Sequence, residues 1–392
     1  MRPALLKPFG IAVFACLLAL ALWSGPVSAV EPIKIGLVLS ITGYGGFIGT
    51  PQKDATVAIV DDVNRKGGLF GRQIELFVED DKSNPTNAAI AAMKLIKDKK
   101  VSIVIGPSIT DSGMSMIPVC DQEKTPFVVT GPVVSPFRKW IFLVGPGDTR
   151  GAVQLFDTAI KRFSPKKIAF FHDSSNYGLT AAKILKPEIS KYPGVSFIIE
   201  EQFEPTDTTM VPQLTKIKAS NPDMILLYTS SQPAAVIAKN YKQLGMNTLV
   251  VGSGGIAVPE FIKNSGKIAE ESKWAIWELK SVTAEKLPMD DPYRKEIYEP
   301  FKALLKEKYG PSKEVSVFHT VAYDGIQIAI EALKLAKSDD RAAIRDALEN
   351  LKFHKGFISD FECTPQDHQG GKIGNLIFNG LRNGELWPYD AK

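Results

Sequence analysis

Short apolar runs alternate with longer amphipathic stretches along most of the chain. The first run, residues 33–39, is rich in Ile, Leu and Val, which is typical of a buried strand. Apolar residues between Ala55 and Val63 then recur at the spacing of one helix face. Pro51 suits the first turn of this helix, and Gly67-Gly68 provides its end. The opening of the chain therefore reads as a strand followed by a helix.

The same alternation continues and predicts parallel sheets. Further strands are expected at 74–78, 101–105, 127–129, 167–171, 195–199, 224–227 and 249–251. Further helices are expected at 84–97, from 178 onward, at 210–219, 234–244 and 323–337. The tail from 356 reads as short strands and turns. Two runs of about 120 residues with no Gly/Ser linker between them predict two similar α/β lobes joined by ordered crossings.

The N-terminus predicts export. Arg2 and Lys7 precede an almost wholly apolar run over 9–23, and small residues at 27–29 suit a signal peptidase. We interpret 1–29 as a signal peptide that directs the protein to the periplasm, leaving 363 residues after Ala29. A membrane anchor, or a lipoprotein anchor on Cys16, is the less favoured alternative, because the apolar run is short for a span and the residues before Cys16 are a poor lipobox.

Charge and cysteine content narrow the function classes. The chain has 47 basic and 43 acidic side chains, a net charge of +4, so no excess of basic charge points to nucleic acid. Cys120 and Cys363 remain after signal cleavage. A disulfide and two buried thiols are about equally compatible with an exported protein. No close cysteine pair suggests a structural zinc site.

The glycine-rich stretch SITGYGGFIGT, residues 40–50, does not read as a phosphate loop. Ile48 stands where a dinucleotide fingerprint needs its third glycine, and no lysine completes a P-loop. No nucleophile elbow is present, and the four histidines lack metal-ligand spacing. We therefore expect neither an enzyme nor a bound cofactor or metal.

The segments after the predicted strands share one character. They carry hydroxyls, glycines and a few aromatic residues but little charge, as in 106–110, 172–177, 228–231 and 252–255. Ligands of open α/β sheets bind at these carboxyl ends. The pattern therefore predicts a cleft for a small molecule, with polar groups for orientation and apolar walls.

Several motifs together resemble one family, the periplasmic leucine/isoleucine/valine-binding proteins, which are receptors of ATP-driven importers. The motifs are 33–36, Ser40-x-Thr42-Gly43, Asn64 with the glycines to Arg72 and Ile74, Asp80-Asp81 with Asn84-Pro85, Ile105-Gly106-Pro107, 172–178 and 322–325. The resemblance implies two Rossmann-like lobes joined by three crossings, with a ligand cleft that closes by hinge motion. It also implies a membrane permease as partner, and we expect the receptor to act as a monomer.

The resemblance also implies domain boundaries. The first lobe is expected to contain 30–148 and 280–373, and the second to contain 149–279 and 374–392. Both cysteines then fall in the first lobe, which mildly favours a disulfide.

Site residues are carried over position by position. Thr110 is expected to bind the ligand carboxylate, Tyr177 to cover the ligand, and Ser230 to reach it from the second lobe. Further expected contacts are Phe47, Ile48, Ser108, Gly131, Pro132, Val133 and Gly254. The small residue and the threonine that the family has after the fourth strand fall on Gly131 and Val133, or one residue later, so in either register the threonine hydroxyl is missing.

Gly254 stands where the family has the acid that holds the ligand's ammonium group. A buried ammonium is costly without an anion. We therefore expect a ligand without an α-amino group, namely a small carboxylate, an aromatic acid or an amide. A hydrophobic amino acid is the alternative, with Asp148 or Glu278 as the substitute anion. A receptor for a signalling partner is a further alternative, and an exported hydrolase is the least favoured.

Overall fold

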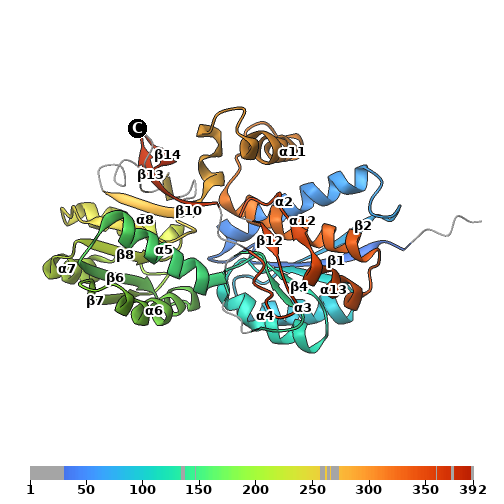
Figure 1. Cartoon of the computed structure of the whole chain (residues 1–392), viewed down its shortest axis with the longest axis horizontal. Coiled ribbons are helices and arrows are strands. Elements are labelled where there is room, and N and C mark those ends of the chain that lie inside the picture. The colour runs from blue at the N-terminus through green and yellow to red at the C-terminus, as the bar shows by residue number, and fades with distance from the viewer. Residues whose placement is uncertain are drawn as a thin grey trace, which may run out of the picture.

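The computed structural model describes residues 31–133, 137–145, 147–256, 261–262, 265, 273–358, 360–371 and 375–389. The signal peptide expected at 1–29 lies outside these residues. Two sheets stand side by side, each flanked by helices, as the two lobes expected from the sequence (Figure 1). Within the described residues no helix is long and apolar enough to span a membrane.

The first lobe is built on a parallel sheet in the order β2-β1-β3-β4-β5. Its strands and the helices between them are β1 (Ile33–Leu39), α2 (Gly46–Arg65), β2 (Ile74–Asp80), α3 (Pro85–Lys97), β3 (Ile103–Gly106), α4 (Thr110–Gln122), β4 (Phe127–Val129) and β5 (Ile141–Leu143). The N-cap expected at α3 is confirmed, because Asn84 Oδ1 accepts the N–H groups of Thr86 and Asn87 at 2.9 and 3.1 Å.

The second lobe has a sheet in the order β14-β13-β10-β9-β8-β6-β7. Its first part comprises α5 (Gly147–Phe163), β6 (Lys167–Asp173), α6 (Asn176–Glu188), β7 (Ser196–Phe203), α7 (Val211–Ser220), β8 (Met224–Tyr228), α8 (Ser231–Gln243), β9 (Leu249–Gly252) and β10 (Trp274–Leu279). The last strands of the chain complete it, because β13 (Leu376–Arg382) pairs antiparallel with β10, and β14 (Glu385–Pro388) pairs with β13.

Between β10 and β13 the chain returns to the first lobe. This part contains α11 (Glu299–Tyr309), α12 (Val317–Ala336), α13 (Arg341–Asn350) and the short pair β11 (Lys352–Phe353) and β12 (Phe361–Glu362). Helix α12 packs on α2 and α13. Its buried Asp324 accepts the N–H groups of Phe357 and Ile358 at 2.7 and 2.8 Å, which fixes the following segment.

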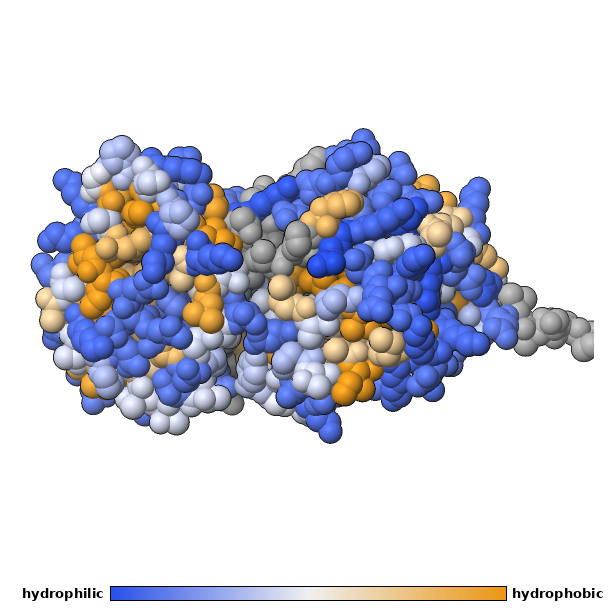
Figure 2. Space-filling model, turned by 90° about the horizontal axis from the view of Figure 1, so that it is seen from below, coloured by the Kyte–Doolittle hydropathy of each residue, from blue (hydrophilic) through white to orange (hydrophobic). Residues whose placement is uncertain are grey.

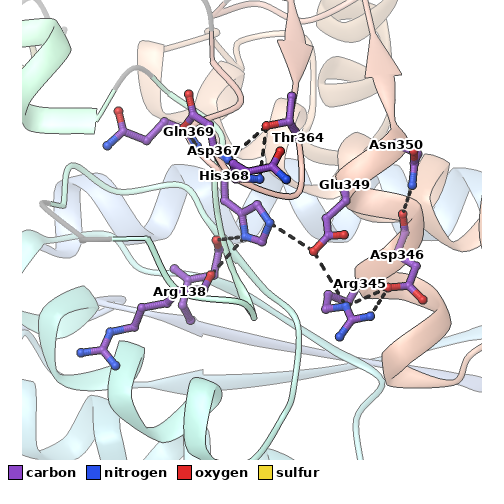
Figure 3. Close-up of polar contacts among 11 residues, drawn as sticks. Arg138, Arg345, Asp346, Glu349, Asn350, Thr364, Asp367, His368 and Gln369 are labelled. Carbon is purple, nitrogen blue, oxygen red and sulfur yellow. Dashed lines mark hydrogen bonds and ion pairs between the residues drawn. The ribbon is translucent and has the colours of Figure 1, made fainter.

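The tail loop after β12 is fastened to the first lobe by His368. The His368 ring stacks on Phe142 with centroids 4.1 Å apart, and its Nδ1 lies 3.1 Å from the carbonyl of Ile141. Figure 3 shows its Nε2 directed at Glu349, which lies beside Arg345 on α13. The loop's neighbouring residue Asp367 pairs with Arg150 of α5 at 2.7 Å. This part of the tail therefore contacts both lobes.

Two expectations from the sequence need correction. Cys120 and Cys363 are buried and free, and they belong to different core clusters, so the disulfide that the resemblance favoured is not formed. Helix α2 begins at Gly46, so Phe47 and Ile48 lie on its first turn rather than on a loop, and Pro51 lies inside the helix. A proline this close to the N-terminus removes only one intrahelical hydrogen bond.

Candidate functional site

The carboxyl ends of the two sheets enclose a cavity of about 260 Å³ between the lobes. Its lining includes the starts of α2, α4 and α12 from the first lobe, and the ends of β6, β8 and β10 with the loop after β9 from the second. In the space-filling view from below, the molecule narrows between two lobes with hydrophobic patches on an otherwise largely hydrophilic surface (Figure 2). The cavity is thus at the position that the strand ends predicted.

The first lobe contributes a polar end at the start of α4. Thr110 is 5% exposed, and its hydroxyl has no hydrogen-bond partner among the described residues. The first N–H groups of a helix have no partner within it, and they carry the positive end of the helix dipole. A buried hydroxyl beside such N–H groups is suited to donate a hydrogen bond to a ligand carboxylate.

Replacing Thr110 with Val tests this end of the cavity. The two side chains have nearly the same shape, and the native hydroxyl has no partner to lose. We expect the affinity for a carboxylate ligand to fall about tenfold or more, because hydrogen bonds to charged groups contribute about 1.5–3 kcal/mol. The melting temperature of the empty protein should stay the same or rise. Unchanged affinity in titration calorimetry would place the carboxylate elsewhere.

The second lobe contributes a buried carboxylate, Glu278 near the end of β10. It is 4% exposed, and its Oε2 and Oε1 accept the N–H groups of Gly255 and Leu279 at 2.6 and 2.9 Å. No ion pair to Glu278 occurs among the described residues. Burial raises the pKa of this carboxyl from 4.5 to about 7, although the two N–H groups lower it in part. Glu278 is therefore a carboxylate without a cation, facing the ligand cavity.

Two more acids line the cavity, and both have partners. Asp173 accepts the hydroxyls of Ser175 and Thr229 at 2.6 and 2.9 Å at the start of α6, and burial raises its pKa. Asp111 lies in the first turn of α4 and accepts the side-chain amide of Asn176. No Lys, Arg or His lies among the described lining residues. The cavity is consequently acidic, and Glu278 is its least compensated charge.

The loop after β9 leaves space beside Glu278. The Tyr177 hydroxyl donates to the Gly254 carbonyl at 3.2 Å, across the second lobe's edge of the cavity. A Cβ on Gly254 would lie 3.7 and 3.8 Å from the Glu278 carboxylate oxygens. The carboxylate of Glu278 thus occupies the region where an acid at position 254 would extend.

The residues expected from the sequence fall mostly on the cavity wall. Nine of the ten line it, namely Phe47, Ile48, Ser108, Thr110, Gly131, Pro132, Tyr177, Ser230 and Gly254. Val133 instead lies in the core of the first lobe, against Gly113. The Ser108 hydroxyl is used internally, because it accepts the Ser40 N–H and donates to Gln52 Oε1 at 2.7 Å. Whether the nine contact a ligand remains a prediction.

Direct contacts join the lobes at the rim of the cavity. Asn176 on α6 donates to Asp111 on α4. Burial, followed by the charge of Asp111, raises the pKa of Tyr44, whose hydroxyl also bonds to Asp111. Tyr44 and Asp111 both belong to the first lobe, so the bond between Asn176 and Asp111 is the one of these contacts that joins the lobes.

Several lining residues were not expected from the sequence. They are Asp111, Trp277, Val317 and Val321, among others, whereas Asp173 and Tyr228 belong to the segments after strands that were expected at the cleft. Glu278 was considered only as a substitute anion; its signal is a lone carboxylate in the apolar run WAIWEL. The other candidate anion, Asp148, has a side chain outside the described residues. Among the described residues no group of three or more potential ligands could hold a metal ion.

Comparisons with known proteins agree with this architecture. The chain is 26% identical over 237 residues to a Leu/Ile/Val-binding protein of Rhizobium johnstonii, covering 58% of this chain and 63% of that protein. It is 23% identical to the leucine-, isoleucine-, valine-, threonine- and alanine-binding protein of Pseudomonas aeruginosa, over 88% of this chain and 92% of that one.

A solved structure has the same fold. The branched-chain amino acid transporter substrate binding protein of Streptococcus pneumoniae, in complex with isoleucine, superimposes with a TM-score of 0.76 at 22% identity. The match covers 91% of this chain and 97% of that one. A type 1 periplasmic binding protein of Bordetella pertussis superimposes with a TM-score of 0.80 at 21% identity, over 91% of this chain and 100% of that one, so the fold is that of the type I periplasmic binding proteins.

A family model described as periplasmic binding protein matches residues 32–375. The chain therefore belongs to the periplasmic binding protein family, which is non-enzymatic.

Proposed function

We propose that this periplasmic binding protein captures a hydrophobic α-amino acid and delivers it to the membrane permease of an ABC importer. The ligand's ammonium group pairs with Glu278 of the second lobe. Its carboxylate meets the Thr110 hydroxyl and the start of α4 in the first lobe, and its side chain lies against the apolar wall.

The observation that carries the proposal is the buried, uncompensated carboxylate of Glu278 inside the cavity. Burying one unpaired charge is costly, and a ligand ammonium group offsets that cost. The sequence reading of a ligand without an α-amino group rested on the missing acid at Gly254. Glu278 lies beside Gly254, so the missing acid at position 254 no longer favours a ligand without an α-amino group. The relatives are named as proteins that bind leucine, isoleucine and valine, and these names support a hydrophobic amino acid as the ligand.

Closure of the lobes follows from binding the two ends of the ligand in different lobes. A zwitterion that is held by its carboxylate in one lobe and by its ammonium group in the other favours the closed form over the open one. The contact between Asn176 and Asp111 supports the closed form in addition.

The proposal predicts a pH dependence of binding. In the empty protein the pKa of Glu278 is raised to about 7, so the carboxyl is increasingly neutral below that pH. Pairing with an ammonium group needs the ionised form. We expect the affinity for leucine to fall as pH decreases through about 7, approaching tenfold per pH unit, because one proton is taken up on release.

Titration calorimetry between pH 5 and pH 9 measures this, with leucine, valine and phenylalanine compared with the matching carboxylic acids that lack the amino group. Binding of the acids with no binding of any amino acid would overturn the proposal. A flat pH profile for leucine would remove Glu278 as its partner.

A further inference from the structure

Aromatic side chains are concentrated on the cavity wall. Among the described residues the lining includes six of them, namely Tyr44, Phe47, Tyr177, Tyr228, Trp277 and Phe318. They come from both lobes and from elements far apart in the sequence. This composition exceeds what a small branched aliphatic side chain requires.

In the first lobe, Phe47 and Phe318 form one aromatic pair. Phe47 lies on the first turn of α2 and Phe318 on the first turn of α12, with ring centroids 5.8 Å apart and planes at 71°. Val317, Val321 and Ile358 extend the same wall. A further ring placed against this pair can make offset or edge-to-face contacts, which aromatic rings prefer.

In the second lobe, Tyr177 and Tyr228 form another pair, with centroids 4.7 Å apart and planes at 45°. The Tyr177 hydroxyl is directed to the Gly254 carbonyl, on the side of Glu278. Aromatic side chains therefore adjoin the end of the cavity where the ligand's ammonium group is expected.

The size of the cavity also favours a side chain larger than a branched aliphatic one. Its volume is about 260 Å³. An apolar cavity of about 150 Å³ already accepts benzene. An amino-acid head group together with a phenyl ring fits the larger volume, whereas valine would leave part of the wall without contacts, at a cost in dispersion energy.

From these observations we propose that the preferred ligand is an amino acid with an aromatic side chain, held with its ring against Phe47 and Phe318. The inference rests on the proposed function, because it uses Glu278 as the partner of the ammonium group. The acidic lining, which includes no Lys, Arg or His among the described residues, also disfavours an acidic substituent on the ring.

Titration calorimetry with phenylalanine, tyrosine, leucine and valine tests the inference. In the native protein, phenylalanine should bind about tenfold tighter than leucine, because contacts between aromatic rings add to the effect of burial. In Phe318→Leu and Phe47→Leu the affinity for phenylalanine should fall more than the affinity for leucine, so that this preference largely disappears. Phe70→Leu is the matched control, because Phe70 is exposed near the other end of α2 and should keep the preference.

The outcomes separate the two proposals. If leucine or valine binds as tightly as phenylalanine in a pH-dependent manner, the aromatic preference is wrong while the proposed function stands. If phenylalanine keeps its advantage in both cavity variants, the ring does not lie where we place it. If none of the four amino acids binds, the proposed function itself fails.

Discussion

Replacing Glu278 with Gln is expected to lower the affinity for amino acids by a factor of about 30 or more, because removing one member of a buried charge pair costs about 2–5 kcal/mol. The amide keeps the size of the side chain, but its single carbonyl oxygen can accept only one of the two N–H groups of Gly255 and Leu279, which bond to different oxygens of the native carboxylate. What it loses is the charge that the ligand's ammonium group needs. Titration calorimetry at pH 8 measures this loss directly.

The same variant is expected to be more stable than the native protein when no ligand is present. The folded pKa of Glu278 is raised from 4.5 to about 7, so its contribution to stability is fully present below pH 4.5 and is lost as pH rises through 7. At pH 8 the native protein therefore carries a penalty on the order of 3 kcal/mol that the glutamine variant avoids, and the N–H group left without an acceptor in the variant offsets part of this gain. Asp324 behaves similarly, so variant and native protein are compared at one pH.

Opposite changes in affinity and stability exclude the trivial explanation that the variant is misfolded. A matched double variant, Gly254→Glu with Glu278→Gln, moves the carboxylate to the neighbouring position and should recover part of the lost affinity, because a Cβ there lies within 4 Å of the native carboxylate. Native affinity in Glu278→Gln would show that the ammonium group binds elsewhere.

Replacing Gly49 with Ala is expected to produce a large loss of stability. A Cβ at this position would lie 2.1 Å from the backbone oxygen of Ser40. That backbone cannot move freely, because the Ser40 N–H is bound to Ser108 Oγ at 3.0 Å and Ser108 is bound to Gln52. We expect a loss of about 3 kcal/mol, at the upper end of overpacking effects, measured by urea unfolding.

Gly254→Ala is the control for this prediction. A Cβ on Gly254 would meet nothing closer than 3.5 Å, so its unfolding midpoint should match that of the native protein. If Gly49→Ala unfolds at the native urea concentration, the contact between α2 and the end of β1 is looser than its geometry indicates.

Sequence reasoning predicted the fold through local signals. The strand at 127–129 and the capped start of α3 at Pro85 occur where the apolar runs and the Asn-Pro pair indicated. The start of α2 was misplaced, because glycines are poor helix formers and here are retained for close packing on Ser40. The start of α2 depends on its tertiary contact with Ser40, which no local sequence pattern indicates.

The sequence predicted the site residues that come directly after strands. Thr110 and Tyr177 come directly after strands, and both line the cavity. The importance of Glu278 was not predictable in this way, because it depends on β10 lying next to β9, which brings residue 278 beside Gly254 and Gly255. That neighbour relation links positions more than 20 residues apart, and the spacing of residues within each segment does not encode it.

The pairing of β10 with β13 has a consequence for the order in which the protein can form during synthesis. The central strand β10 receives its antiparallel neighbour only from Leu376–Arg382, near the end of the chain. In the other lobe, Asp324 is buried only when Phe357 and Ile358 have arrived to donate their N–H groups. Neither lobe can therefore complete its core before these later residues are present, so the two lobes cannot fold one after the other as independent halves of the chain.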